Sequence, residues 1–289
     1  MPVQCQSIFR QTHLSLSPMP VHLSPDPFVA QSNASPSFAR PICRSVQCQS
    51  SPSSARSICR PFTAIAINET WIHRCDHGQM FTSYHMNDSN IPYSTVFAGI
   101  PDNYYNLFFK SRYAFYYIYT HLSKDFEWYL KADDDTYVVV EHLKKYLSTL
   151  DPDVPYYLGY VLKTYLKDGY NAGGAGYILS RAALKIFSER LYANEELCPD
   201  DILEDVGIGR CLANAGITPT DTRNAKKQNR FNTLTPFEML QKNRWNTDVV
   251  KYPELEGYEA IAEDLISFHH LSADELRLFE ILLYRVGRP

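Results

Sequence analysis

The sequence feature that most constrains the fold is a run of three aspartates, Asp133 to Asp135, set between two apolar segments. Residues 126–130 before the run are mostly aromatic or aliphatic, and residues 138–140 after it are all valine. Both segments are typical of buried strands, because aromatic and β-branched side chains suit a packed, pleated surface. Three carboxylates beside a core are unfavourable unless a cation compensates their charge.

The aspartate run favours a divalent-cation site. Side chains two residues apart in extended backbone point the same way, so we expect Asp133 and Asp135 to converge. Two converging carboxylates suit Mg²⁺ or Mn²⁺ and leave coordination positions open for a phosphate. A solvated acidic turn is the alternative. An EF-hand loop is excluded, because its sixth and twelfth positions would be Val138 and Lys144 rather than glycine and glutamate.

Composition narrows the class of protein. The 289 residues carry a formal net charge of −4, which argues against nucleic acid as a partner. No run of about 18 apolar residues is present, so the sequence predicts no transmembrane helix. The seven cysteines fit the spacing of no zinc module. Two of them, Cys198 and Cys211, bracket one segment and could close it as a short disulfide loop.

The first 60 residues differ from the rest of the chain. They are rich in serine, proline, glutamine and arginine, and residues 35–44 recur in similar form as 51–60. Such low-complexity sequence buries too little apolar surface to offset the entropy lost on ordering. We therefore predict a disordered tract over residues 1–60 and one globular domain over residues 61–289.

Three further segments carry chemistry-bearing residues. The glycines at 173, 174 and 176 allow either close approach to a ligand or a tight turn, and they match neither a P-loop nor GxGxxG. Glu204 and Asp205 fall on an expected helix, where acids often only complement the helix dipole. His269 follows the apolar residues 265–268 and is either structural or the nitrogen ligand that two carboxylates would lack.

Taken together, these motifs resemble the inverting β1,3-glycosyltransferases, and within that family the branch that builds core 1 O-glycans. Residues 128–138 resemble the family's metal motif and residues 170–180 its glycine-rich segment. Residues 204–211 resemble its Glu-Asp motif, and residues 267–269 its C-terminal histidine motif. Order and spacing agree over about residues 64–285.

The resemblance implies an α/β fold of the GT-A type, with a Rossmann-like mixed sheet flanked by helices. The implied reaction moves galactose from UDP-galactose to the 3-hydroxyl of GalNAc on serine or threonine of a glycoprotein, with inversion and with Mn²⁺ as cofactor. Family members are type II Golgi membrane proteins. Alternatives left open are a fringe-like N-acetylglucosaminyltransferase and a truncated, non-catalytic relative of a lectin or chaperone kind. Whether the chain forms a homodimer is also open.

The resemblance also implies roles for individual residues. Asp133, Asp135 and His269 would hold Mn²⁺, and Asp205 would be the base that Glu204 supports. The other implied contacts are to the donor, from Asp134, Lys131 and Gly174, and to the acceptor, from Trp245, Gly173 and Tyr177. Local packing is an equal alternative for Trp245.

The sequence departs from the family pattern at several points. The apolar strand expected before the first helix is missing and the Ser/Pro tract stands in its place, so Cys75 would lose its disulfide partner. A Cys pair expected near residues 258–263 is absent. His270 stands where the family has tyrosine, and no membrane anchor precedes the domain.

Overall fold

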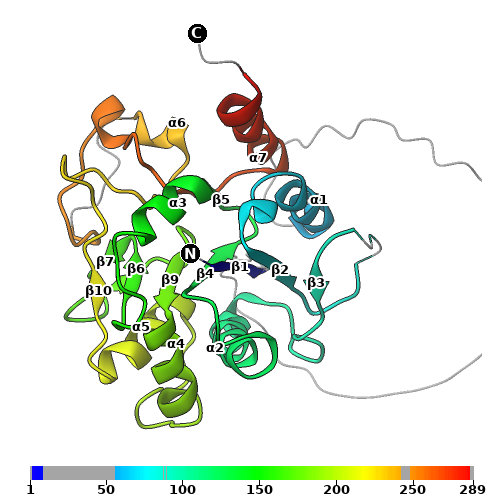
Figure 1. The fold of residues 1–289 in the computed structure, drawn as a ribbon, viewed down its shortest axis with the longest axis vertical. Coiled ribbons are helices and arrows are strands. Elements are labelled where there is room, and N and C mark those ends of the chain that lie inside the picture. The colour runs from blue at the N-terminus through cyan, green and yellow to red at the C-terminus, as the bar shows by residue number, and fades with distance from the viewer. Residues whose placement is uncertain (1, 9–55, 87, 89, 242–247, 287–289) are drawn as a thin grey trace, which may run out of the picture.

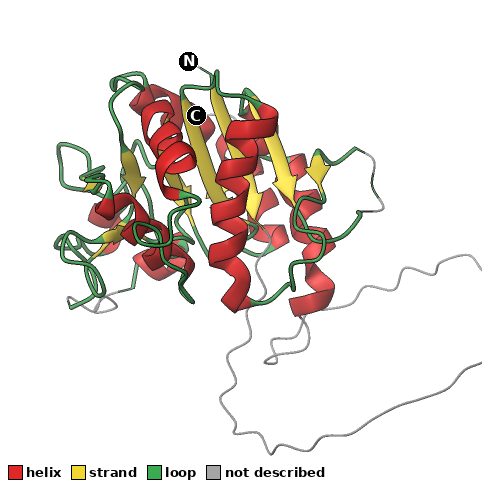
Figure 2. Ribbon diagram, turned by 90° about the horizontal axis from the view of Figure 1, so that it is seen from below, coloured by secondary structure: helices red, strands yellow, loops and turns green. Residues whose placement is uncertain are grey.

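The computed structural model describes residues 2–8, 56–86, 88, 90–241 and 248–286. Its centre is a seven-stranded sheet with helices on both faces (Figures 1 and 2). Across the sheet the strands follow the order β10-β6-β9-β4-β1-β2-β3. Neighbouring strands are parallel except around β9, which is antiparallel to β4 and to β6. The predicted α/β class is confirmed, and the arrangement agrees with a GT-A fold.

The elements have the following bounds. The strands of the main sheet are β1 (Val3–Ile8), β2 (His77–Phe81), β3 (Tyr93–Ser94), β4 (Trp128–Asp133), β6 (Tyr157–Gly159), β9 (Tyr177–Ser180) and β10 (Pro219–Thr220). Two small sheets pair β5 (Tyr137–Val138) with β11 (Ser267–Phe268), and β7 (Val161–Leu162) with β8 (Tyr170–Asn171). The α-helices are α1 (Arg56–Glu69), α2 (Leu107–Tyr117), α3 (Val140–Leu147), α4 (Arg181–Ile186), α5 (Glu204–Asn214), α6 (Pro236–Met239) and α7 (Ala273–Glu280).

Strand β1 corrects the prediction that the first strand is missing. Val3–Ile8 lies in the middle of the sheet and pairs in parallel with both β2 and β4. The Val3 N–H also donates a 2.7 Å hydrogen bond to Asp76 Oδ2, just before β2. The disordered tract was therefore predicted too broadly, since six of its residues form a strand and five of these, Gln4 to Ile8, are paired on both sides. Residues 9–55 lie outside the described part of the chain.

Two further features concern the start of the domain. Helix α1 begins at Arg56, so the fold includes residues ahead of the boundary predicted at residue 61. Cys75 is disulfide-bonded, so the expectation that it loses its partner is also wrong. None of the helices in the described ranges is long and apolar enough to cross a membrane.

The sheet separates two hydrophobic cores, because alternate strand residues face opposite sides. Trp128 and Leu130 of β4 pack in the core beneath α1, α3 and α7, above the sheet in Figure 1. Tyr129 of β4 and Tyr177 of β9 pack in the core over α2, α4 and α5, below the sheet. Lys131 and Asp133 lie on the same face of β4 as Tyr129, further toward the carboxyl end of the strand.

The strand order places the aspartate run where a ligand is expected. Strands β1, β2 and β3 succeed one another in one direction, and β4 lies on the other side of β1. In open α/β sheets, ligands bind outside the carboxyl ends of the strands at such a reversal. Asp133 is the last residue of β4 and is paired in register with Ile8, the last residue of β1.

Candidate active site

The aspartate run forms a turn, and its carboxylates take different partners. Strand β4 ends at Asp133, and the Thr136 N–H donates a 3.2 Å hydrogen bond to the Asp133 carbonyl oxygen. Asp134 and Asp135 lie inside this turn. The expectation of continuous extended backbone is therefore wrong, because the rule that residues two apart share a direction holds only within a strand.

Asp135 meets two histidines, and we call Asp135, His269 and His270 the histidine cluster. Strand β11 pairs with β5, which carries the chain after Phe268 back to the aspartate turn. His269 Nε2 lies 3.0 Å from Asp135 Oδ1, and His270 Nδ1 lies 3.9 Å from Asp135 Oδ2. One potential ligand atom from each residue lies within 4.8 Å of the others. A carboxylate with imidazoles is a donor set that suits divalent first-row transition metals.

Asp133 belongs to a second group, and we call Lys131, Asp133 and Glu204 the lysine cluster. The Lys131 ammonium donates a hydrogen bond to Asp133 Oδ1 and lies 3.5 Å from Glu204 Oε2. It also donates a 3.3 Å hydrogen bond to the Gly173 carbonyl oxygen. All three side chains of the cluster are buried. One lysine thus compensates two carboxylates in a region from which water is largely excluded.

Asp205 is oriented by backbone donors. Its Oδ2 accepts a 3.3 Å hydrogen bond from the Gly173 N–H, and its Oδ1 accepts a 2.9 Å bond from the Val206 N–H. Burial and, secondarily, the charge of Glu204 raise the pKa of the Asp205 carboxyl to about 6, although these hydrogen bonds and Lys131 oppose the shift. A carboxylate with a pKa near the working pH is suited to general base catalysis.

Two consecutive glycines connect these groups. A Cβ atom added to Gly173 would lie 2.6 Å from Glu204 Oε2, and one added to Gly174 would lie 2.0 Å from His269 Cε1. Any side chain at either position would displace a candidate functional group. The Gly176 N–H donates a 3.1 Å hydrogen bond to the Gly173 carbonyl oxygen, and Gly176 has a φ of +75°, so the tight-turn reading of these glycines is confirmed. Gly173 and Gly174 also allow protein side chains to approach the backbone closely. They bring Glu204 and Asp205 on one side close to His269 on the other, across one peptide bond.

Comparison with known proteins identifies the family. Residues 64–247, more than half of the chain, match the Fringe-like family. The chain belongs to this family. The resemblance to β1,3-glycosyltransferases drawn from the motifs is thereby confirmed, and the disulfide expected between Cys198 and Cys211 is present just ahead of and within α5.

Named relatives of this Fringe-like chain are glycosyltransferases. It is 32% identical to glycoprotein-N-acetylgalactosamine 3-beta-galactosyltransferase 1 of Xenopus laevis over 230 aligned residues. The aligned region covers 77% of this chain and 62% of that protein. It is 28% identical over 160 residues to a beta-1,3-glucosyltransferase of Mus musculus, covering 53% of this chain and 31% of that protein. The chain thus spans less than two thirds of the length of these relatives.

The remaining predicted site residues have these places in the Fringe-like fold. Asp134 Oδ2 accepts a 3.3 Å hydrogen bond from the Thr63 hydroxyl of α1. Tyr177, predicted to contact the acceptor, has no exposed surface, and its hydroxyl donates a 2.7 Å hydrogen bond to Glu204 Oε1. The structure therefore gives it a part in positioning Glu204. Trp245 lies outside the described residues.

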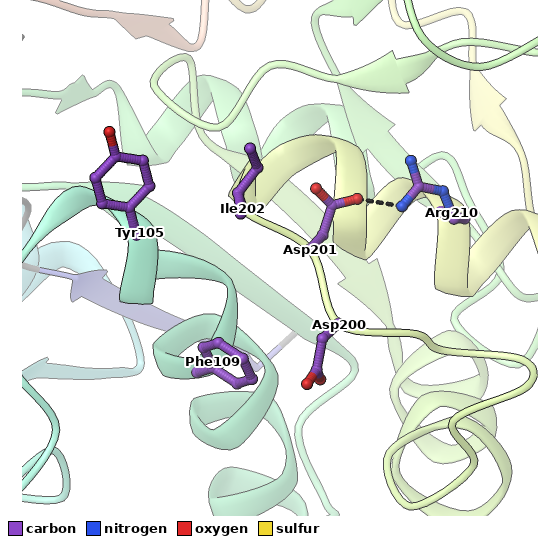
Figure 3. A pocket seen from close by; sticks show the side chains of 6 residues that line it. All are labelled: Tyr105, Phe109, Asp200, Asp201, Ile202 and Arg210. Atoms are coloured by element: carbon purple, nitrogen blue, oxygen red, sulfur yellow. Dashed lines mark hydrogen bonds and ion pairs between the residues drawn. The ribbon is translucent and has the colours of Figure 1, made fainter. Parts of the chain in front are cut away.

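Sequence reasoning missed two features of the site. His270 was noted only as a departure from the family pattern, although its place directly after His269 was the available signal. A cavity of about 340 Å³ beside the start of α5 was not anticipated. Figure 3 shows Tyr105 and Ile202 at this cavity and the ion pair between Asp201 and Arg210 at its edge. Its lining residues come from two segments that are far apart in the sequence, one around Tyr105 and one around Ile202.

Proposed function

We propose that this chain transfers galactose from UDP-galactose to the 3-hydroxyl of N-acetylgalactosamine on a glycoprotein, with inversion at the transferred sugar. The observation that carries the proposal is the pair Gly173–Gly174, which joins Asp205 on one side to His269 on the other. A single displacement needs this arrangement, with a base for the acceptor and a group that neutralises the leaving diphosphate. The name of the Xenopus laevis relative supports the choice of sugar and acceptor.

Asp135 and His269 would hold Mn²⁺, and the fit rests on their donor atoms. The carboxylate oxygen and the imidazole nitrogen lie 3.0 Å apart, and two ligands about 2.1 Å from one ion are about 3.0 Å apart at a right angle. When bound, Mn²⁺ would neutralise charge on the departing UDP. Asp133 remains a proposed third ligand, which would require its carboxylate to be shared with Lys131.

Asp205 would take the proton of the acceptor hydroxyl. The hydroxyl oxygen forms the new bond to the anomeric carbon, the bond to the diphosphate breaks, and the proton goes to the Asp205 carboxylate. The N–H groups of Gly173 and Val206 fix the orientation of that carboxylate. Glu204, held by Tyr177 and Lys131, supports Asp205 because its charge favours the protonated form that the reaction creates.

The binding of the two substrates is part of the proposal. Lys131, Asp134 and Gly174 would lie on the donor side, next to the carboxyl end of β4. On the acceptor side, Gly173 borders Asp205, and the cavity lined by Tyr105 and Ile202 includes residues 200–202, which lie just ahead of Asp205 in the chain. We assign this cavity to the peptide that carries the acceptor sugar, with Trp245 as a further contact. The Golgi lumen would be the place of action.

A transfer assay tests the proposal. The full chain is incubated with Mn²⁺, a GalNAc-bearing peptide and UDP-galactose, UDP-glucose or UDP-N-acetylglucosamine in parallel. We expect galactosyl product, and we expect Asp205→Asn to lower the rate by about 10²- to 10⁴-fold while Mn²⁺ affinity is kept. Asp135→Asn should lose both. Asp274→Asn, whose side chain is almost fully exposed on α7, should change neither.

Each outcome of the assay decides something. Product from another UDP-sugar, and none from UDP-galactose, would overturn the choice of galactose but leave the proposed sugar-transfer reaction standing. No product from any donor, with a cooperative unfolding transition showing that the chain is folded, would overturn the enzymatic function. Full activity in Asp205→Asn would remove Asp205 from the role of base.

A further inference from the structure

His270 adopts a backbone conformation that places its ring beside that of His269. Its φ is +63°, in the left-handed region that residues other than glycine seldom occupy. If the chain continued as an extended strand after Phe268, the two histidines would point to opposite sides. The left-handed turn instead brings their ring centroids to 3.8 Å, with 33° between the planes. Both imidazoles therefore lie on the side of Asp135.

The backbone fixes this turn to the aspartate. The Leu271 N–H, directly after His270, donates a 3.0 Å hydrogen bond to the Asp135 carbonyl oxygen. The segment from His269 to Leu271 thus closes on Asp135 through both main chain and side chains. Because His269 and Leu271, the two neighbours of His270, both contact Asp135, the main chain of His270 is held beside the aspartate.

The distances from Asp135 to each histidine are those expected of two ligands to one ion. Two ligands about 2.1 Å from a metal ion lie about 3.0 to 4.2 Å apart as the angle between them opens from a right angle. The separations of 3.0 Å from His269 Nε2 and 3.9 Å from His270 Nδ1 to the nearest oxygens of Asp135 fall in this range. His270 is the most exposed of the three side chains, at 56%, which leaves one side of the site open to water or substrate.

We propose that His270 is a second nitrogen ligand, so that the site is a two-histidine, one-carboxylate centre that prefers Co²⁺, Fe²⁺ or Zn²⁺ to Mn²⁺. The inference rests on the proposed function, because it concerns the same cation site. Imidazole suits these metals, whereas Mn²⁺ is also well served by oxygen ligands, and affinity for nitrogen ligands rises from Mn²⁺ through Fe²⁺ to Co²⁺. Each added imidazole therefore favours the later metals more.

The test measures metal binding in the absence of any sugar nucleotide. The metal-free full chain is titrated with Mn²⁺ and with Co²⁺ by calorimetry, and pulsed electron paramagnetic resonance of the Mn²⁺ form counts the directly bound nitrogens. We expect two nitrogens in the wild type and one in His270→Gln. Co²⁺ affinity should fall by at least about tenfold in this variant, and Mn²⁺ affinity by about threefold.

Two further variants keep the outcome interpretable. His270→Gly accepts the left-handed backbone without strain, so it should lose one nitrogen even if His270→Gln disturbs the turn. His73→Gln removes an exposed histidine from the 3-10 turn Ile72–Arg74 and should leave both affinities unchanged. One nitrogen in the wild type, or unchanged nitrogens and affinities in both His270 variants, would overturn the proposal and leave simple ring stacking.

The two proposals can fail separately. A chain that binds Mn²⁺ or Co²⁺ through two nitrogens but transfers no sugar would contradict the proposed function and retain His270 as a ligand. A chain that transfers galactose but has only one nitrogen bound to the ion would support the proposed function and contradict the role of His270 as a ligand.

Discussion

The lysine cluster and the histidine cluster lie on either side of the Gly173–Gly174 pair and handle negative charge in different ways. In the first, Lys131 supplies a permanent positive charge to two buried carboxylates. In the second, Asp135 keeps 34% of its side chain exposed and meets imidazoles, which are ordinary metal ligands. The comparison predicts that the Lys131 ammonium is a positive charge built into the fold, whereas the proposed metal ion would be an exchangeable one. Stability should depend on the first and activity on the second.

The largest effect on stability is expected from Lys131→Met. The change leaves Asp133 and Glu204 buried without their cation, so we expect the free energy of unfolding to fall by about 3–5 kcal/mol. Urea denaturation at neutral pH, with and without chelator, measures it. Because Asp133 is also a proposed metal ligand, chelator keeps a metal ion from replacing the Lys131 charge, so the full loss is expected when chelator is present.

Lys144→Met is the matched control for this prediction. Lys144 pairs with Asp76 at 2.9 Å, but both side chains are about a third exposed, so its loss should cost no more than about 1 kcal/mol. Equal effects of the two substitutions would break the distinction between a cation built into the fold and an ordinary ion pair.

A smaller effect on stability, and a specific one on metal binding, is expected from Gly174→Ala. The new methyl group would lie 2.0 Å from His269 Cε1, so the imidazole must move. We expect about 1–3 kcal/mol of destabilisation from overpacking and at least about a tenfold loss of Mn²⁺ or Co²⁺ affinity, measured by calorimetry.

Gly216→Ala separates backbone strain from this displacement. Gly216 has a φ of +79° and nothing within 4 Å of an added Cβ, so alanine there should cost about 1 kcal/mol of strain without changing metal affinity. Retention of full metal affinity in Gly174→Ala would show that the histidine cluster does not depend on the glycine pair.

The smallest effect is a shift in the pH dependence of transfer in Glu204→Gln. Asp205 acts as a base only when ionised, so wild-type kcat/KM should fall as the pH drops through about 6. Removing the Glu204 charge lowers the pKa of Asp205 toward its usual value, while burial, the larger cause, remains. The acid limb should therefore move to lower pH by less than about one unit.

The measurement is a pH profile of kcat/KM at saturating metal, together with unfolding curves at each pH. In the folded Glu204→Gln variant, the acid limb of the kcat/KM profile could instead move to higher pH or stay in place. Either result would contradict the assignment of Asp205 as a base whose pKa is raised by Glu204.

The sequence was informative about the candidate site where its residues belong to motifs that follow one another in a fixed order along the chain. It placed Asp135, His269, Glu204 and Asp205 in one site, and the structure brings these segments together at the end of β4. It could not show how the charges are shared, because Lys131 meets Glu204 only after strand β4 and helix α5 have packed. The partnership of Lys131 with Asp133 needed only strand alternation, but that rule was applied to Asp133 and Asp135, across the turn where it fails.

Strand β1 shows a firmer limit. Residues 3–7 repeat as the identical sequence Val-Gln-Cys-Gln-Ser at 46–50, inside the low-complexity tract, so local preference alone does not identify residues 3–7 as a strand. The pairing of Val3–Ile8 with β2 and β4 decides it through contacts between distant segments. The low-complexity setting pointed the other way, and here tertiary structure overrides composition.

The central place of β1 also has a consequence for biosynthesis. This strand is translated before both of its neighbours, and β4 follows only after α1, β2, β3 and α2 have been made. Until then its two hydrogen-bonding edges have no strand to receive them, and exposed edges invite association between nascent chains. Closing the long loop between β1 and β4 should be the slow event in maturation of the polypeptide.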